Sequence, residues 1–178
     1  MSEFLKMVES KCYFVTFTVV DWLDVFAKLE YSDILVNRIQ YCQKHKGLEV
    51  YAYCIMPSHI HMIASTKLKL GDILRDLKKY TSKAIVKAIE DNPRESKREL
   101  LLACFRKAAM NSSRHKHYCF WRDTNPPEEL YSDKFYRQKE MYIHMNPVEE
   151  GIVSKPEHYR LSLVSDESAI KVLSWYGF

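Results

Sequence analysis

Residues 51–64 read Tyr51-Ala52-Tyr53-Cys54-Ile55-Met56-Pro57-Ser58-His59-Ile60-His61-Met62-Ile63-Ala64. The run indicates two apolar strands around a tight break at 56–58. Because successive side chains of a strand point to opposite faces, His59 and His61 share one face, while Ile60 and Met62 point the other way into a core. Two imidazoles side by side on a rigid strand can hold a divalent metal ion and leave most of its coordination sphere open. The other interpretation is that both are ordinary polar positions on a half-exposed strand.

The composition indicates a globular chain with one sizeable core. Of 178 residues, 47% are hydrophobic, and only 4 are glycine and 6 proline, which argues against a loop-rich or disordered chain. The net charge of +4 permits a polyanionic partner without demanding one. We expect no secretory signal, because the N-terminus has an acidic residue and no apolar run. We expect no membrane span either, because no window approaches about 18 uninterrupted apolar residues.

The cysteines are widely spaced and include no C-x-x-C pair, which is neither a disulfide framework nor a zinc-finger pattern. We therefore expect reduced thiols and a cytoplasmic protein. The five positions are Cys12, Cys42, Cys54, Cys104 and Cys119.

Hydrophobic periodicity predicts the other strands and helices. In chain order we expect a strand over 11–20, a helix over 31–46, the hairpin strands over 48–55 and 59–64, helices over 72–90 and 94–110, a strand over 118–121 and a helix from 133 to about 145. Ser132 is a plausible N-cap for the last helix, and Pro147 ends it. No pattern assigns residues 21–30.

The core elements follow the order β-α-β-β-α-β, with extra helices. This order predicts an α+β fold of the ferredoxin-like type, an antiparallel sheet with its helices on one face. Both histidines fall on the third strand, inside the sheet. We expect a single domain over residues 1–160 and a C-terminal tail over 161–178, whose structure the pattern does not define.

A second motif lies near the end of the last predicted helix and reads Tyr142-Ile143-His144-Met145-Asn146-Pro147-Val148. Tyr142 and Asn146 are four residues apart, so on a helix they occupy one face. Taken alone, a single tyrosine and a single asparagine are typical of core packing or of the surface.

The two motifs together, in this order, resemble the His-hydrophobic-His single-tyrosine transposases, specifically the REP-associated tyrosine transposases. The similarity runs from the first strand to about Tyr159. It also rests on Leu77-Lys78-Lys79-Tyr80-Thr81-Ser82-Lys83 and on Phe120-Trp121. Ser58 stands where this family more usually has asparagine before the first histidine, which leaves the histidine pair intact.

The resemblance implies a transposase-like catalytic domain that cleaves and rejoins single-stranded DNA, with hairpin DNA as the expected substrate. It implies that Tyr142 is the nucleophile that forms a 5′-phosphotyrosine. It also implies that His59, His61 and Asn146 hold a divalent metal, Mg²⁺ or Mn²⁺, which polarises the scissile phosphate. A homodimer is left open.

Basic and aromatic residues are the candidates for contacts with DNA. Trp121, with Arg122 beside it, could stack on unpaired bases. The helix over 72–90 carries basic side chains that could contact phosphates, namely Arg75, Lys78, Lys79, Lys83 and Lys87. The structural alternatives are a solvated helix face for the basic residues and core packing for Trp121.

Two other functions remain open from the sequence. The first is a non-catalytic module of the same fold that binds single-stranded nucleic acid. The second is a zinc protein that uses His115, His117 and Cys119 with Cys104, although this spacing matches no known zinc pattern.

Overall fold

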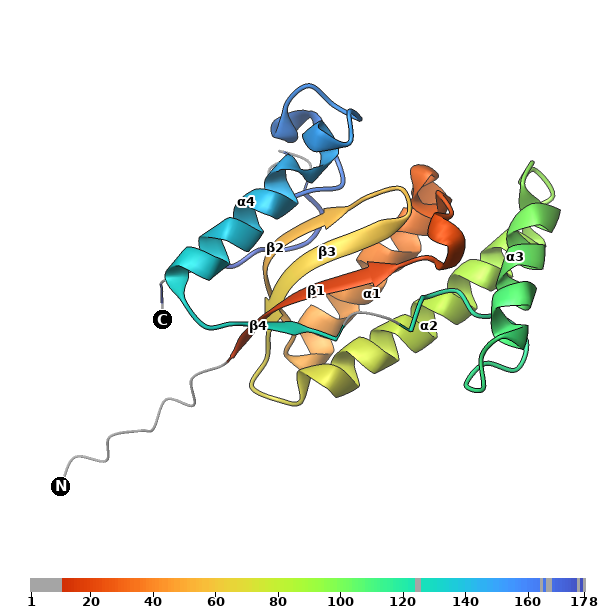
Figure 1. Cartoon of the computed structure of the whole chain (residues 1–178), viewed down its shortest axis with the longest axis horizontal. Helices are drawn as coiled ribbons and strands as arrows, with labels where there is room; N and C mark the ends of the chain where they lie inside the picture. The colour runs from red at the N-terminus through yellow and green to blue at the C-terminus, as the bar shows by residue number, and fades with distance from the viewer. Residues whose placement is uncertain (1–10, 124–125, 164, 166–167, 176, 178) are drawn as a thin grey trace.

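A four-stranded antiparallel sheet in the order β2-β3-β1-β4 forms the centre of the molecule (Figure 1). The computed structural model describes residues 11–123, 126–163, 165, 168–175 and 177. The strands are β1 (Cys12–Thr18), β2 (Glu49–Ile55), β3 (His59–Ser65) and β4 (Glu128–Leu130). The order and the antiparallel pairing are those of the ferredoxin-like arrangement, so the predicted α+β class is confirmed.

The helices lie on both faces of this sheet. On one face lie α1 (Leu29–Lys46) and α2 (Leu70–Asp91), with α3 (Arg98–Met110) packed beside α2 (Figure 1). Helix α4 (Asp133–Glu149) lies across the other face. The expectation that the helices share one face therefore holds for α1 and α2 and is wrong for α4. Short 3₁₀ turns are η1 (Val20–Trp22), η2 (Val25–Ala27) and η3 (Pro156–His158).

The alternation of side chains along β3 separates two apolar layers. Ile60 and Met62 belong to the large core beneath α1 and α2. Ile63, on the opposite face, belongs to a smaller cluster, which Tyr136 and Ile143 of α4 complete. His59 and His61 share the face of Ile63, as the period of two predicts.

The fourth strand is not where the sequence placed it. Residues 118–121 make only an isolated bridge, Val19 with Trp121, and the strand that pairs with β1 is Glu128–Leu130. Cys119, Phe120 and Trp121 are all buried. The N–H of Cys119 donates to the carbonyl of Phe105 in α3, and the carbonyl of Phe120 accepts from the N–H of Val20. Because these backbone bonds do not form a ladder with one neighbouring strand, this aromatic run fills the core as an irregular segment.

Helix α4 continues past the residue that was expected to end it. Pro147 lies inside α4, and Asn146 before it is 4% exposed, so Asn146 is not at a fraying end. A proline costs one helical hydrogen bond. The turn after it remains well bonded, because the backbone N–H of Glu150 donates to the carbonyl of Asn146, and that of Ile152 donates to the carbonyl of Pro147.

The described part of the tail lies along the outer side of β2. The N–H of Ile55 donates to the carbonyl of Leu161 at 2.8 Å, and the N–H of Leu163 donates to the carbonyl of Tyr53 at 3.1 Å. Further on, the N–H of Leu173 donates to the carbonyl of Val50 at 2.9 Å. Among the described residues, no helix has the length and apolar character that crossing a membrane requires.

Ser132 caps the start of α4, as predicted. Its hydroxyl accepts a hydrogen bond from the backbone N–H of Phe135 at 3.3 Å. Ser132→Ala removes this acceptor and is expected to lower the free energy of unfolding in urea by about 1 kcal/mol. Ser132→Asp keeps an acceptor and is expected to unfold near the wild-type midpoint. Equal losses in the two variants would show that the cap does not stabilise α4.

Candidate functional site

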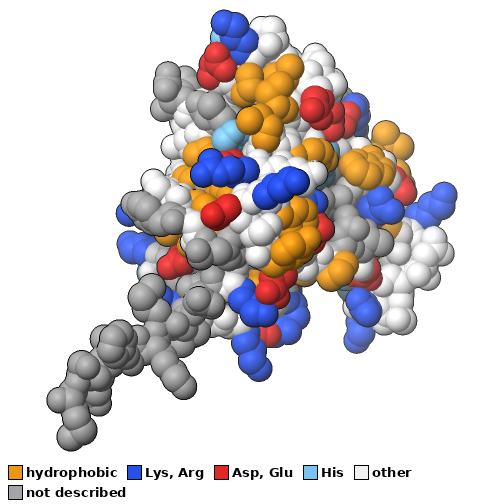
Figure 2. Space-filling view, turned by 60° about the vertical axis from the view of Figure 1, so that its left-hand side comes forward, with side chains coloured by type: hydrophobic (Ala, Val, Ile, Leu, Met, Phe, Trp, Pro, Cys, Tyr) orange, Lys and Arg blue, Asp and Glu red, His pale blue; other side chains and the backbone are white. Residues whose placement is uncertain are grey.

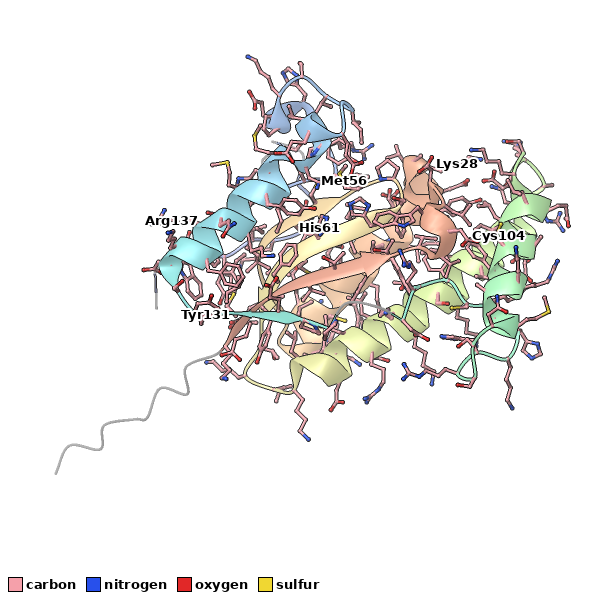
Figure 3. All side chains as sticks on the ribbon, in the orientation of Figure 1. Lys28, Met56, His61, Cys104, Tyr131 and Arg137 are labelled. Carbon is pink, nitrogen blue, oxygen red and sulfur yellow. The ribbon has the colours of Figure 1, made fainter. Side chains whose placement is uncertain are left out.

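The site begins with two imidazoles on β3, at the end that follows the β2–β3 turn. The ring centroids of His59 and His61 are 4.7 Å apart, and both residues are buried. Figure 3 shows His61 on the side of the sheet that faces α4. The phenyl ring of Phe14 stacks on His61 with its centroid at 5.4 Å, which restrains the ring on the sheet surface.

Neighbouring hydroxyl groups orient both rings. The Oγ of Ser58 lies 3.1 Å from Nδ1 of His59, and Oγ1 of Thr16 lies 2.9 Å from Nδ1 of His61. When Nδ1 donates to a hydroxyl oxygen, the lone pair is on Nε2, and such partners of Nδ1 commonly orient histidine ligands of metals. Both imidazoles can therefore present Nε2 as a ligand. Ser58 is thus the residue whose hydroxyl orients His59.

Helix α4 brings the second motif to the first. The hydroxyl of Tyr142 lies 3.4 Å from Nε2 of His61, and 41% of the Tyr142 surface is exposed. Asn146, one turn further along α4, is buried, and its Oδ1 has no hydrogen-bond partner within the described part of the chain. A buried amide oxygen without a partner is costly unless a ligand satisfies it.

Glu150 is a site residue that sequence reasoning missed. Its Oε1 lies 3.9 Å from Nε2 of His59. Because Pro147 was expected to end the helix, nothing indicated that Glu150 would face the sheet. With Pro147 inside α4, Glu150 follows Asn146 by about one further turn on the same side.

Burial controls the protonation of the site. It lowers the pKa of His61 to about 3, with the charges of His59 and Lys139 adding to the effect. Burial also lowers the pKa of His59, against the opposing influence of Glu150 and Asn146. Both imidazoles are therefore neutral near pH 7, the form that binds metal. Burial raises the pKa of the Tyr142 phenol, which Asn146 partly offsets, so the phenol is protonated near pH 7.

The donor set fits a divalent ion. Two neutral imidazoles and an unpartnered amide oxygen, with a carboxylate near His59, are ligands that Mn²⁺ accepts and that suit Mg²⁺ through their oxygens.

The alternative zinc site has no comparable support. Among residues 11–123, 126–163, 165, 168–175 and 177, no three His, Cys, Asp or Glu side chains form a cluster that could hold a metal, so the site around the histidine pair depends on the amide oxygen of Asn146 as a further donor. Cys119 is buried, and its thiol donates to the carbonyl of Trp121 at 3.4 Å, while Nε2 of His115 lies 3.7 Å from Oδ1 of Asp123.

Comparison with known proteins agrees with this geometry. Residues 12–101, which include both histidines, match the family described as "Transposase IS200 like". The chain belongs to the IS200-like transposase family. No curated protein matches the chain.

The transposase is also similar in fold to a solved structure described as the "REP associates tyrosine transposase bound to a REP hairpin". The two chains are 18% identical with a TM-score of 0.62, and the match covers 98% of this chain and 100% of the other. At this identity the likeness establishes the shared fold. It extends beyond the family match to α4 and its Tyr142.

The basic side chains of α2 do not join the histidine pair, because α2 lies on the opposite face of the sheet. Arg75 pairs with Asp72 at 2.9 Å, whereas Lys79 and Lys83 are exposed. Lys78 instead extends along the protein, and its Nζ donates to the carbonyl of Arg122 at 3.1 Å. Figure 2 shows cations mixed with acidic and apolar side chains on the face it presents, with no continuous basic patch there.

Trp121 is in the core. It is 3% exposed, and its Nε1 donates to Oγ1 of Thr81 at 3.1 Å. The prediction that Trp121 stacks on an unpaired base is therefore wrong, and its alternative, packing in the core, is confirmed. Arg122 is only partly buried and stays at the surface.

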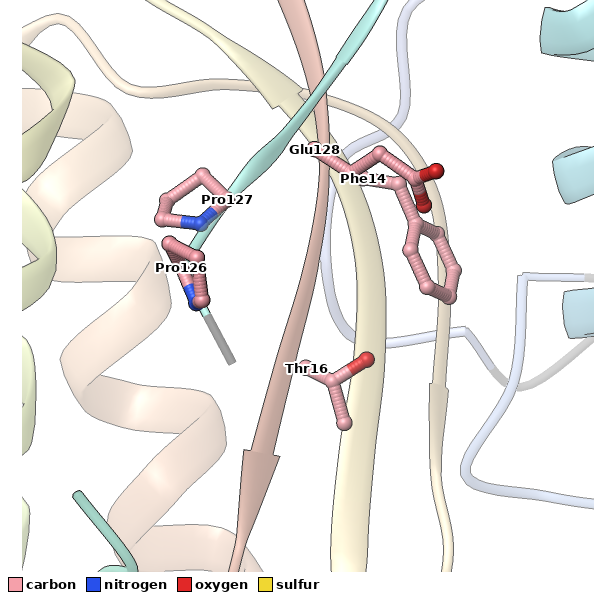
Figure 4. A pocket seen from close by; sticks show the side chains of 5 residues that line it. All are labelled: Phe14, Thr16, Pro126, Pro127 and Glu128. Atoms are coloured by element: carbon pink, nitrogen blue, oxygen red, sulfur yellow. The ribbon is translucent and has the colours of Figure 1, made fainter. Parts of the chain in front are cut away.

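A hollow of about 480 Å³ adjoins the site along β1 and the approach to β4 (Figure 4). Phe14 and Thr16, which line it, both also contact the ring of His61. Pro126, Pro127 and Glu128 form the other side. The ring centroid of Tyr142 lies 6.0 Å from that of Phe14, so the hollow is close to the phenol.

The burial of neutral His61 makes stability depend on pH. Since its pKa of about 3 in the folded protein lies below the ordinary 6.5, the unfolded chain gains a proton in this window that the folded chain does not. Stability is therefore lost as pH falls below about 6.5, by about 1.4 kcal/mol per pH unit for one proton. His61→Gln is expected to flatten this decline, measured by urea denaturation of the metal-free protein.

The control for this measurement is His45→Gln, which changes an exposed histidine near the end of α1. This variant is expected to lose stability with acidification as steeply as the wild type. If the slopes of His61→Gln and the wild type coincide, His61 is not held neutral by burial.

Proposed function

We propose that this transposase cleaves and rejoins single-stranded DNA through a covalent 5′-phosphotyrosine at Tyr142. The observation that carries the proposal is the meeting of two distant motifs. The Tyr142 hydroxyl is 3.4 Å from His61 Nε2, beside the buried and unpartnered Oδ1 of Asn146 in the described structure. Neither core packing nor surface exposure accounts for a phenol, two oriented imidazoles and an unsatisfied amide oxygen in one place.

The proposed ligands of the metal are Nε2 of His59, Nε2 of His61 and Oδ1 of Asn146, and Oε1 of Glu150 lies 3.9 Å from Nε2 of His59. Bound Mg²⁺ or Mn²⁺ would polarise the scissile phosphate and neutralise the charge that develops on it. Because the three proposed ligands are neutral, they leave the ion its full charge for this task.

Tyr142 supplies the nucleophile. Its phenol oxygen attacks the phosphorus, the bond from phosphorus to the 3′ oxygen breaks, and that oxygen leaves as a 3′-hydroxyl once it takes up a proton. The phenol gives up its own proton in the same step. The new ester keeps the energy of the phosphodiester, so attack by a 3′-hydroxyl on the phosphotyrosine can reseal a strand without ATP and restore the phenol.

The proposed substrate is a hairpin with an unpaired extension. The similar solved transposase is bound to a hairpin, and the exposed Tyr142 can be reached by a single strand. We propose that exposed basic side chains of α2 contact phosphates away from the cleaved bond, namely Arg75, Lys79 and Lys83. Nearer to the cleaved bond, we propose phosphate contacts from Lys78 and Arg122.

The second candidate function is a binding module of the same fold without cleavage. It needs the fold but not the chemistry at Tyr142. Adduct formation therefore separates the two candidates.

Tyr142→Phe removes the nucleophile and leaves the ring that packs near Phe14. In the presence of Mn²⁺, wild-type protein is expected to form a covalent adduct with hairpin DNA, visible as a shifted band in denaturing gels. Tyr142→Phe is expected to form none and to bind the hairpin with about wild-type affinity. Tyr131→Phe, which changes an exposed tyrosine outside the cluster, keeps the adduct. An adduct in Tyr142→Phe would contradict the assignment, and its absence in all proteins would favour the binding module.

Asn146→Ala tests the metal site without DNA. Loss of a direct ligand is expected to weaken Mn²⁺ binding by at least about tenfold, since the loss of groups that merely orient ligands already costs that much. Calorimetric titration of the metal-free protein measures this affinity. Asn111→Ala, which changes an exposed asparagine after α3, is expected to bind Mn²⁺ like the wild type. Unchanged affinity in Asn146→Ala would remove Asn146 from the ligand set.

A further inference from the structure

The turn after β1 carries an exposed tryptophan in a strained backbone. Asp21 and Trp22 have φ of 53° and 54°, and Trp22 is 55% exposed. Residues other than glycine rarely adopt this left-handed region, and for a bulky side chain it is a genuine outlier. Such strain persists where the surroundings enforce it, and it gathers at functional sites.

Backbone hydrogen bonds on both sides of the turn enforce this conformation. The N–H of Val19 donates to the carbonyl of Ser58 at 2.9 Å, and the N–H of Phe26 donates to that of Pro57 at 2.8 Å. The N–H of Val20 donates to the carbonyl of Phe120 at 2.9 Å. These bonds hold the turn against the β2–β3 connection, directly before His59. Figure 1 shows the turn at the end of the sheet where β2 and β3 are connected.

The side chain of Trp22 lies against the proposed metal site. Its ring meets that of His59 edge to face, with centroids 5.5 Å apart. The guanidinium carbon of Arg122 is 5.7 Å from the indole centroid. Arg122 is itself held in place, because its N–H donates to the carbonyl of Thr18 and its carbonyl accepts from Lys78.

We propose that Trp22, flanked by Arg122, is a stacking platform for one unpaired nucleobase of the DNA strand next to the scissile phosphate. The inference rests on the proposed function and identifies where that substrate is held. An exposed indole face stacks on any base, and a guanidinium beside it attracts the strand. Asp21 and Asp24 lie on either side of Trp22 in the sequence, and their charges repel phosphates. A nucleobase is therefore favoured over the sugar–phosphate backbone as the group that packs on the indole.

Binding of unstructured strands without metal tests the platform apart from catalysis. The probes are a fluorescent oligothymidylate and a strand of equal length made of abasic nucleotides, compared by anisotropy in buffer with a chelator. Wild-type protein is expected to prefer the thymidylate strand by about tenfold, within the range that stacking of one base supplies. Trp22→Ala is expected to lose this preference and to bind the abasic strand as the wild type does. Trp22→Phe is expected to retain part of it.

Two further variants keep the test decisive. Tyr41→Ala removes another exposed aromatic ring next to an arginine, with the guanidinium carbon of Arg38 4.4 Å from its centroid, but on α1 across the sheet. It is expected to bind both strands normally. Trp22→Gly relieves the left-handed strain, so it is expected to unfold in urea no earlier than the wild type while losing the preference for bases.

The outcomes separate the platform from the rest of the proposal. Equal thymidylate binding by folded Trp22→Ala and the wild type would overturn the platform, as would an equal loss on the abasic strand. If no strand gives a Tyr142 adduct while Trp22→Ala still loses its preference for bases, the proposed cleavage fails and the platform stands.

Discussion

The antiparallel pairing of β1 with β3 is the constraint on which the arrangement depends. Its register sets Thr16 opposite His61 and Thr18 opposite His59, so the same pairing that builds the sheet also supplies a hydroxyl that orients one imidazole. Because side chains alternate, a slip by one residue would turn both imidazoles into the apolar core and bring Ile60 to the opposite face. The packing of Ile60 and Met62 under α1 and α2 therefore fixes the chemistry on the other face.

Helix α4 converts this surface into an enclosed site. Tyr136 and Ile143 anchor it on the sheet, and on its neighbouring positions it carries a reachable phenol and a buried amide. The same cover withdraws water from the imidazoles and keeps them neutral, so one packing event both assembles the donors and sets their protonation. Its sequence gives little sign of this role, because the apolar contacts are few and a proline interrupts the pattern.

Local sequence patterns predicted the strands and helices whose conformation depends on residues close in sequence. They missed the segments whose conformation depends on packing against residues distant in sequence. Alternation around His59 and helical spacing over 72–90 were sufficient for the hairpin and for α2, whereas the last strand of the predicted order was placed at 118–121 instead of at β4. The charged β4 was missed, since Glu128–Leu130 forms a strand only because β1 offers a partner. Trp121 has the composition of a stacking residue but lies under α2, whereas Trp22 stands in a segment with no periodicity. The resemblance named His59, His61, Tyr142 and Asn146, which the structure brings close together, and the continuation of α4 added Glu150.

The described tail along β2 has a consequence for how this protein meets copies of itself. Unpaired backbone N–H and C=O groups on an edge strand can form hydrogen bonds with a strand of another molecule. In β2, several of these groups already form hydrogen bonds with Leu161, Leu163 and Leu173 of the tail. On the other border, β4 is three residues long, carries Glu128 and Glu129 and follows two prolines, a combination that discourages a further strand. Among the described residues, both borders of the sheet therefore carry features that disfavour the addition of a strand from another molecule, which lowers the tendency to form fibrous aggregates.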